Sequence, residues 1–501
     1  MASSPFDTRD VERDANGALR YTNPPASLAA MLRASVERAP HAEALVEVGG
    51  PRVTYGELWQ RAARVAGGLR ALGLKPGDRA AIRLPNGTAW VEAFFGCVLA
   101  GVVVVPVNTR FTDKEVQYVV DDSGARFVFT AGTALPDGAP FAAGELKPDD
   151  LAAVFYTSGT TGFPKGAMTA HRNLLSNCET VFRVLRIDRT VPTRTLVSVP
   201  LFHVTACDSQ LLPTLMQGGT TVIMPAFDIK AFLRAIAAER IDNLITVPAI
   251  YWFAINQPEF ADLDVSHVKW LSYGGAPIAP SLVRQLKLKF PNARVGNGFG
   301  LTETTSIATY LPHEYAAEHA DSVGFPSPVM EVKLLDADPA TGVGELLIRG
   351  GNVVSGYWNK PEKTAAAFVD GWLHTGDLAR IGPNGLVYIV DRKKDMINRG
   401  GENVYCVEVE NAIAAFPGVA EVAVIGVPDA MMGEKVGAVV VPLPGMALDA
   451  EALVAHCKSE IADFKVPQYL HVQAEPLPRN PSGKILKPKL RETVKWGRAL
   501  R

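Results

Sequence analysis

The chain has 501 residues, enough for roughly two to four domains with a large buried core. Hydrophobic residues make up 48% and charged residues 20%, and the formal net charge of −2 provides neither a basic surface for nucleic acid nor a polybasic patch for membranes. The five cysteines form no CxxC pair, which favours reduced thiols in a cytosolic enzyme over a disulfide framework.

The N-terminal stretch is acidic and polar, which is typical of neither a signal peptide nor a transit peptide. The longest aliphatic run, AGVVVVPV, is too short to cross a bilayer. We therefore expect a cytoplasmic protein, monomer or homodimer, that binds no nucleic acid and has no transmembrane segment. Transient contact with a membrane surface stays open.

The first part of the chain alternates helix and strand patterns. Thr54 and Glu57 have the spacing of a capping box, and apolar residues then recur at helical spacing as far as Gly73. The order βαβαβ, with apolar strands that do not alternate, predicts a parallel sheet covered on both faces. Its predicted elements are strand 79–84, helix 89–101, strand 102–105, helix 113–122 and strand 127–130.

The same alternation returns later, in the strand 220–224, helix 228–240, strand 243–248, strand 269–275 and helix 279–290. From about residue 322 short strands with glycine turns follow, and the last hundred residues predict a compact α+β unit. The charged stretch DRKKD, 391–395, is the best candidate for a linker between these regions.

We therefore expect an α/β protein of two domains. The large N-terminal domain, residues 1–391, would contain layered parallel-sheet βαβ subdomains and a β-rich subdomain. A hinge at 392–395 would lead to a small, mobile α+β domain at 396–501.

The most informative short segment is YTSGTTGFPKG, 156–166, which combines three glycines, several hydroxyl residues and Lys165. Glycines let backbone N–H groups approach a ligand, and the hydroxyls and the lysine suggest a phosphate chain. The spacing excludes a P-loop NTPase, because Gly166 and Ala167 stand where a magnesium-binding hydroxyl should follow the lysine. A small-residue surface turn is the alternative for such a segment considered alone.

Five more polar clusters follow this loop: SYGGAP (272–277), NGFGLTET (297–304), WLHTGDL (372–378), DRKKDMINRGGENVY (391–405) and NPSGKILK (480–487). In this order the six segments resemble the adenylate-forming superfamily of acyl-CoA synthetases, adenylation domains and beetle luciferases, over residues 28–492. Within that superfamily the chain is most similar to bacterial fatty-acid–CoA ligases and 4-coumarate–CoA ligases.

The resemblance implies a reaction in two steps. A carboxylate attacks the α-phosphate of ATP to give acyl-AMP and pyrophosphate, and the thiol of coenzyme A then displaces AMP. Both steps move negative charge, so positioned cations and backbone donors are the expected tools. The implied small molecules are ATP, Mg²⁺ and coenzyme A, together with the carboxylic acid.

The resemblance also implies roles for single residues in nucleotide binding. The loop residues Thr157, Ser158, Gly159, Thr160, Thr161, Gly162 and Lys165 would hold the β- and γ-phosphates. Thr302 would contact phosphate, and Glu303 would bind Mg²⁺, for which one protein carboxylate is sufficient. Asp377 would accept the ribose hydroxyls, with Arg392 beside it. The adenine would lie between Gly274, Gly275 and Ala276 on one side and Gly298, Phe299 and Gly300 on the other.

Three further assignments concern the small domain. Lys484 would bridge the carboxylate and the α-phosphate during adenylation. Lys394 would be the pivot about which the small domain rotates between the two steps. Gly400 and Gly401 would then flank the pantetheine chain of coenzyme A, where a narrow passage favours glycine.

The expected acyl pocket begins at His203, which lies where amino-acid-activating relatives place an aspartate, and this argues against an amino-acid substrate. The other expected pocket residues include no arginine, which disfavours a second substrate carboxylate. An apolar acid, fatty or aromatic, is therefore predicted. These residues are Thr205, Ser209, Tyr251, Trp252, Gly274, Gly298 and Ile307. Tyr251 and Trp252 could either shorten the tunnel or point outward into the core, and the sequence leaves both alternatives open.

Two other functions stay open: an acyl-AMP ligase that loads a carrier protein, and a nucleotide-binding regulatory protein without catalysis. One departure from the family pattern is the short segment between residues 131 and 155. We expect it to lack a surface helix without damage to the site.

Overall fold

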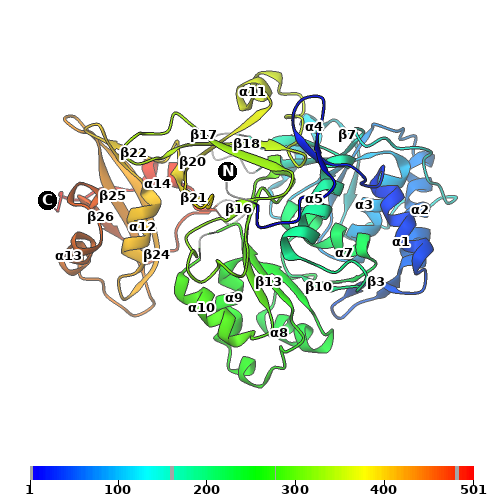
Figure 1. Cartoon of the computed structure of the whole chain (residues 1–501), viewed down its shortest axis with the longest axis horizontal. Coiled ribbons are helices and arrows are strands. Elements are labelled where there is room, and N and C mark those ends of the chain that lie inside the picture. Colours follow the sequence, from blue (N-terminus) through cyan, green and yellow to red (C-terminus); the bar gives the residue numbers. More distant parts are fainter. Residues whose placement is uncertain (1–3, 158–162, 277, 480–483, 501) are drawn as a thin grey trace.

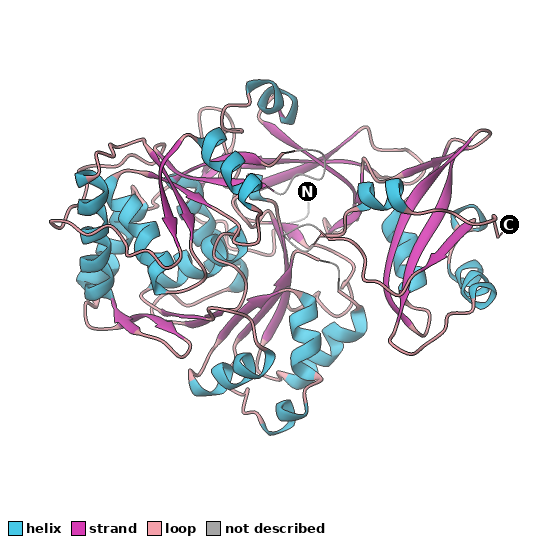
Figure 2. Ribbon diagram, turned by 180° about the vertical axis from the view of Figure 1, so that it is seen from behind, coloured by secondary structure: helices cyan, strands magenta, loops and turns pink. Residues whose placement is uncertain are grey.

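The structure, a computed structural model, describes residues 4–157, 163–276, 278–479 and 484–500. A large body built from the N-terminal part of the chain lies beside a smaller C-terminal unit (Figure 1). Seen from behind, helices flank the strands of the large body (Figure 2). This is the two-part α/β architecture expected from the sequence.

The first sheet has the strand order β7-β5-β6-β8-β9. Its core strands are parallel, as predicted, but β8 and β9 form an antiparallel hairpin at the edge. The segment between Thr157 and Lys165 is too short for the crossover that a parallel pair needs, and the sequence analysis had predicted no strand at β9. The strands are β5 (Arg79–Arg83), β6 (Val103–Pro106), β7 (Ala125–Thr130), β8 (Leu151–Thr157) and β9 (Lys165–Ala170).

Helices α2 (Tyr55–Ala71), α3 (Thr88–Ala100) and α4 (Asp113–Ser123) accompany this sheet. The predicted capping box is confirmed at the start of α2, where Thr54 accepts from the backbone of Glu57 and the Glu57 side chain accepts from the backbone of Thr54.

Residues 131–150 contain no helix, as expected, and part of this segment packs along α2. The backbone N–H of Gly138 donates to the carbonyl of Arg64 at 3.1 Å. A Cβ on Gly67 would lie 1.9 Å from the carbonyl oxygen of Ala139. Glycine inside α2 is thus explained by the close approach of this segment.

The second sheet has nine strands in the order β16-β15-β14-β13-β12-β10-β11-β3-β4. From β14 to β3 neighbouring strands are parallel, and antiparallel strands close both ends. The bounds are β3 (Glu43–Glu47), β4 (Arg52–Thr54), β10 (Arg194–Val197), β11 (Thr220–Ile223), β12 (Asn243–Thr246), β13 (Trp270–Gly274), β14 (Arg294–Phe299), β15 (Thr309–Leu311) and β16 (Phe325–Pro326).

The predicted β-rich region is an antiparallel sheet with the order β17-β18-β20-β19, and β21 pairs with β20. The small unit has the order β23-β22-β25-β24, with β26 beside β25. These strands are β17 (Met330–Leu335), β18 (Gly344–Gly350), β19 (Phe368–Val369), β20 (Trp372–Ile381), β21 (Val387–Arg392), β22 (Ile397–Arg399), β23 (Glu402–Val404), β24 (Val419–Asp429), β25 (Gly433–Pro442) and β26 (Tyr469–Val472).

The remaining elements are β1 (Val11–Arg13), β2 (Leu19–Tyr21), α1 (Leu28–Arg38), α5 (His171–Leu185), α6 (Val204–Ala206), the π-turn η1 (Cys207–Leu211), α7 (Leu212–Gln217), α8 (Ile229–Ala238), α9 (Pro248–Ile255), the 3₁₀ turns η2 (Pro258–Asp262), η3 (Thr302–Thr304) and η4 (Asp463–Lys465), α10 (Pro280–Lys289), α11 (Pro361–Ala367), α12 (Cys406–Ala414), α13 (Ala450–Glu460) and α14 (Lys487–Thr493). Among the described residues, no helix combines the length and apolar character that a membrane crossing requires. All five cysteines are buried free thiols, in agreement with the sequence analysis.

Candidate active site

A hollow on one face of the second sheet results from small residues in register. Ser272 in β13 pairs with Gly296 in β14, and two residues further Gly274 pairs with Gly298. Residues two apart in a strand point to the same face, so this region of the sheet presents almost no side-chain volume. Tyr310, opposite Gly298 in β15, lies at its edge.

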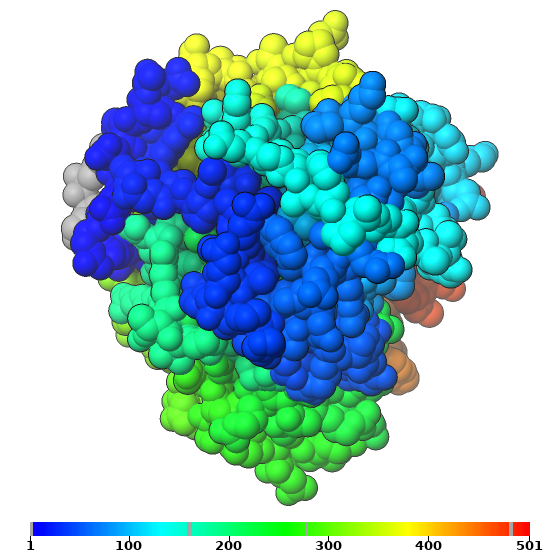
Figure 3. Space-filling view, turned by 90° about the vertical axis from the view of Figure 1, so that its right-hand side faces the viewer, coloured from blue at the N-terminus to red at the C-terminus, as the bar shows by residue number. Residues whose placement is uncertain are grey.

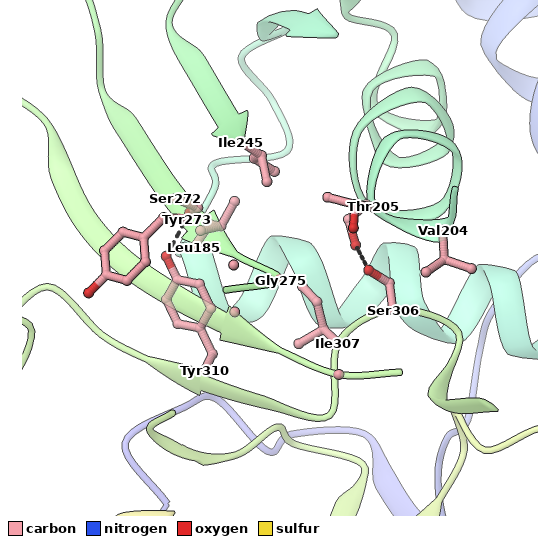
Figure 4. A pocket seen from close by; sticks show the side chains of 14 residues that line it. Leu185, Val204, Thr205, Ile245, Ser272, Tyr273, Gly275, Ser306, Ile307 and Tyr310 are labelled. Carbon is pink, nitrogen blue, oxygen red and sulfur yellow. Dashed lines mark hydrogen bonds between the residues drawn. The ribbon is translucent and has the colours of Figure 1, made fainter. Parts of the chain in front are cut away.

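Figure 4 shows the cavity that results, whose empty volume is about 580 Å³ including the part open to solvent. Above the glycine floor lie residues of α6, η1 and the loop after η3. Ser209 and Ser306 join across it with a hydroxyl–hydroxyl distance of 2.7 Å. The lining residues are Leu185, Val204, Thr205, Ser209, Ile245, Ser272, Tyr273, Gly274, Gly275, Gly298, Gly300, Ser306, Ile307 and Tyr310.

Three of the expected pocket residues, Tyr251, Trp252 and His203, do not line this cavity. The Tyr251 side chain is fully buried, and its hydroxyl donates to the carbonyl oxygens of Leu244 and Ser272 at 3.0 and 2.8 Å. Trp252 is 51% exposed and stacks edge-on with Phe253. Of the two alternatives that the sequence left open, both side chains therefore follow the one that points away from the cavity: Tyr251 belongs to the packed core, and Trp252 faces solvent.

His203 immediately precedes α6 and does not itself line the cavity. Burial lowers the pKa of its imidazole to about 4, and the positive charges of Lys484 and Arg110 lower it further. The ring is therefore neutral near pH 7. Thr205, Ser209, Gly274, Gly298 and Ile307 do line the cavity, as expected.

Asp377 and Arg392 face each other because β20 and β21 pair them in register. The Arg392 Nε donates to Asp377 Oδ1 at 2.7 Å. The second carboxylate oxygen, Oδ2, is buried and has no hydrogen-bond partner among the described residues. Burial raises the pKa of Asp377 to about 6, against the opposing charges of Arg392 and Lys484. A buried acceptor without a donor fits the ribose hydroxyl that the sequence assigns to it.

Glu303, in the turn η3, is held by a residue that the sequence analysis did not identify. The hydroxyl of Tyr357 donates to Glu303 Oε1 at 2.7 Å, and the ammonium of Lys165 lies 3.9 Å from the centre of the same ring. Burial lowers the pKa of Lys165, and the charge of Glu303 opposes this shift. Since 54 residues separate Glu303 from Tyr357, no local pattern could have revealed the pair.

The described residues of the phosphate loop are those at its two ends. Thr157 ends β8 and pairs in register with Lys165, which begins β9, so the two strands form the stem of the loop. The assignments to Ser158, Gly159, Thr160, Thr161 and Gly162 lie outside the described residues. Thr302 begins η3 beside Glu303, and Gly300 precedes it, where a Cβ would lie 1.4 Å from the carbonyl oxygen of Ser306.

The residues assigned to adenine binding lie at or near the cavity. Gly274, Gly275, Gly298 and Gly300 line it, and Ala276 follows as an exposed residue. Phe299 is half-buried against the apolar cluster of the β-rich sheet. Its stacking on adenine stays a prediction.

Lys484 belongs to the small unit, but its charge interacts with charged groups of the large one. Burial lowers the pKa of its ammonium and Arg392 lowers it further, while Asp377 and Glu303 raise it. The side chain keeps contact with solvent, so the surrounding protein covers it only in part. In this conformation the charge of Lys484 therefore interacts with Asp377 and Glu303, and its bridging role in adenylation stays a prediction.

The expected hinge and coenzyme A residues lie on the small-unit side. Burial lowers the pKa of Lys394, and the preceding Lys393 pairs with Glu345 at 2.8 Å. Gly400 and Gly401 occupy the turn between β22 and β23, both with positive φ, which explains glycine at each position. Neither of them lines the cavity.

The acidic residues can support a cation only together with a ligand. Among the described residues, no group of three or more His, Cys, Asp or Glu side chains could hold a metal ion by itself. A single carboxylate such as Glu303 is a suitable oxygen ligand for Mg²⁺ when phosphate oxygens complete the coordination.

Comparisons with known proteins show the family of the chain. Residues 32–143 and 135–358 match the family described as AMP-binding enzyme, and residues 408–484 match the AMP-binding enzyme C-terminal domain. The chain is 40% identical to a feruloyl-CoA synthase of Amycolatopsis, covering 90% of this chain and 96% of the relative. It is 36% identical to the long-chain-fatty-acid–CoA ligase FadD13 of Mycobacterium tuberculosis, with coverages of 92% and 97%.

Among solved structures, ATP-bound MatB from Rhodopseudomonas palustris superposes with a TM-score of 0.86 at 33% identity, covering 94% of this chain and 99% of MatB. The fold, the site and both parts of the sequence thus agree. The chain therefore belongs to the AMP-binding enzyme family and is an AMP-forming acyl-CoA synthetase.

Proposed function

We propose that the enzyme activates an apolar carboxylic acid, aromatic or fatty, as acyl-AMP and transfers the acyl group to coenzyme A in the cytoplasm. One observation carries the assignment of its site. The charges of Asp377 and Glu303 raise the pKa of Lys484, and the charge of Lys484 lowers the pKa values of Asp377 and His203. The tail ammonium is thus within electrostatic range of the nucleotide residues and of His203, which supports the role proposed for it.

In the first step, Asp377 and Arg392 position the ribose, and the stem residues Thr157 and Lys165 position the loop around the β- and γ-phosphates. Glu303 would hold Mg²⁺, which offsets phosphate charge. Lys484 contacts the attacking carboxylate, so that two anions can approach each other, and the α-phosphate oxygens, where negative charge builds as the bond to pyrophosphate breaks. One preorganised cation of this kind typically contributes a factor on the order of 10²–10³ in rate.

The cavity supports an apolar acid. Leu185, Val204, Ile245 and Ile307 supply aliphatic walls, and the lining contains no arginine or lysine among the residues that the structure describes. Because His203 is neutral near pH 7, it adds no charge that would hold a second substrate carboxylate. The relatives named for feruloyl-CoA and for long-chain fatty acids agree with an aromatic or fatty tail.

The second step needs a path for the thiol. We propose that the domains are residues 1–391 and 396–501, and that the small domain rotates about Lys394. The Asp391 carboxylate now accepts a hydrogen bond from the backbone N–H of Cys406, which begins α12 of the small domain. This contact belongs to the adenylation pose and would open on rotation, which would bring Gly400 and Gly401 to the thiol.

The experiment is a comparison of half-reactions. Pyrophosphate release should depend on an apolar acid, and AMP release should require free coenzyme A. Lys484→Ala should reduce adenylation by about 10²–10³ while thioester formation from supplied acyl-AMP survives. Lys489→Ala, which removes an exposed lysine of α14, is the matched control and should behave as the unaltered enzyme.

Equal loss of both half-reactions in the Lys484 variant would show that its role is wrongly assigned. Transfer only to a carrier protein would replace coenzyme A as the acceptor. ATP binding without acid-dependent pyrophosphate exchange would indicate a regulatory protein instead.

A further inference from the structure

The first described residues form a segment that lies on the large body instead of extending into solvent. In Figure 3 this dark blue segment lies directly against green residues of the second sheet and its helices. The guanidinium of Arg183, near the end of α5, donates to the carbonyl oxygens of Asp7, at 3.1 Å, and Arg9. The segment is thus tied to α5 at two backbone positions.

Within this segment Phe6 is the buried anchor. Its side chain is 6% exposed, while Ser4 and Asp7 on either side are exposed. Phe6 belongs to the same apolar cluster as Tyr310 and Ile307, which line the cavity. Its ring meets the Tyr310 ring edge-on, with centroids 6.4 Å apart. Phe6 does not line the cavity itself, so it lies behind Tyr310.

Tyr310 closes the inner end of the cavity. Its hydroxyl lies 2.9 Å from the Ser272 hydroxyl, and a Cβ on Gly296 would lie 2.2 Å from its oxygen, so the ring occupies space that only glycine leaves free. In Figure 4, Tyr310 and Ser272 are at one end of the cavity, and Val204 and Thr205 are at the other. Val204 follows His203, which responds to Lys484, so the reacting carboxylate belongs at that second end.

We propose that Phe6 is a backstop for the acyl pocket: the N-terminal segment holds Tyr310 in position as the end wall and so sets the longest acid accepted. This inference rests on the proposed function. The substrate class that fits is an acid whose tail ends at Tyr310, such as a single aromatic ring or a chain of similar reach. Longer acids are excluded by a wall that another part of the chain supports.

Shortening Phe6 tests this directly. Phe6→Ala leaves space behind Tyr310, so the ring can move back and admit a longer tail. At the limit of an apolar pocket, one methylene changes discrimination by about tenfold or more. For straight-chain and phenylalkanoic acids of increasing length, the ratio of kcat/KM for the first excluded acid to that for the best acid should therefore rise at least about tenfold.

A second variant covers the case in which Phe6→Ala does not fold. Arg183→Ala leaves Phe6 intact but removes the donors that hold the segment, and it should shift the length profile in the same direction. Phe290→Ala is the matched control, because Phe290 is a buried ring of the same cluster that packs on Phe260 and not on the cavity. It should lower thermal stability without moving the length profile.

Three outcomes are decisive. A shift of the length profile toward longer acids in the Phe6 and Arg183 variants, but not in the Phe290 variant, supports the backstop. An unchanged length profile in folded Phe6 and Arg183 variants overturns it and leaves the proposed function intact. If the unaltered enzyme releases pyrophosphate with none of the acids, the proposed function fails and the backstop fails with it.

Discussion

Gly298 and Gly274 lie side by side on the floor of the cavity, yet a methyl group should have opposite effects at the two positions. A Cβ on Gly298 would have Tyr310 Cδ2 as its nearest neighbour at 3.8 Å, which is ordinary van der Waals contact. A Cβ on Gly274 would lie 2.4 Å from the carbonyl oxygen of Gly298, and a backbone atom cannot give way cheaply. Gly298→Ala should therefore fold, and Gly274→Ala should be destabilised.

The expected magnitudes for Gly298→Ala follow from the same geometry. Reduced freedom of the unfolded chain should stabilise the variant by about 0.4–1 kcal/mol. Its methyl group projects into the cavity and takes space from the acid. A mismatch of one methyl or methylene group in an apolar pocket costs about 1–3 kcal/mol, so kcat/KM for the best acid should fall about 10–200-fold.

The assay combines thermal unfolding with pyrophosphate release at varied acid and varied ATP concentrations. A folded Gly298→Ala enzyme with unchanged kcat/KM for every acid would refute the identification of this cavity as the acyl pocket. A change confined to kcat/KM for ATP would indicate that the cavity binds the nucleotide and not the acid. Loss of folding in Gly298→Ala would contradict the contact distances.

Other predictions concern the nucleotide residues, the pivot and a buried acid. Because the pKa of Asp377 is about 6, protonation should weaken ATP binding as the pH falls through 6; Asp377→Asn should remove this dependence and raise KM for ATP about tenfold, measured by initial rates against pH. Lys394→Pro should stiffen the pivot and slow thioester formation more than adenylation. A thioester step as fast as that of the unaltered enzyme would show that the pivot lies elsewhere. Asp208 is fully buried, neither carboxylate oxygen has a hydrogen-bond partner among the described residues, and burial raises its pKa well above the ordinary value. The folded chain therefore keeps a proton that the unfolded chain loses above about pH 4, so this group lowers stability as pH rises. Asp208→Asn should reduce that loss by up to about 1.4 kcal/mol per pH unit in urea unfolding, and an unchanged slope would show that Asp208 ionises normally.

Local signals in the sequence were sufficient for much of the fold. The capping box at Thr54 and the apolar strands of the first sheet depend on neighbours within a few residues, and both are present in the structure. The family motifs likewise located Asp377 and Lys484. Signals of this kind do not specify which strands pair, so the antiparallel edge at β9 was missed.

The acyl pocket was harder to predict for a physical reason. Helix α9 is apolar around its whole circumference, so its sequence does not show which side faces the cavity, and the orientation of Tyr251 and Trp252 could not be decided from it. Tyr310 lines the cavity because β14 and β15 set it opposite Gly298, and Phe6 joins it from the other end of the sequence. Strand register and contacts between residues far apart in the chain produce no periodic pattern in the sequence.

Tyr357 acts as an uncharged spacer between two ions of opposite sign. The Lys165 ammonium lies over the Tyr357 ring, and the Tyr357 hydroxyl donates a hydrogen bond to Glu303. Each ion is therefore stabilised by a neutral group. A direct ion pair between them would have to be broken before a triphosphate could enter. With the phenol in between, and with the roles proposed above, Lys165 would exchange a weak ring contact for a strong hydrogen bond to phosphate, and Glu303 would turn to Mg²⁺ without first losing a charged partner.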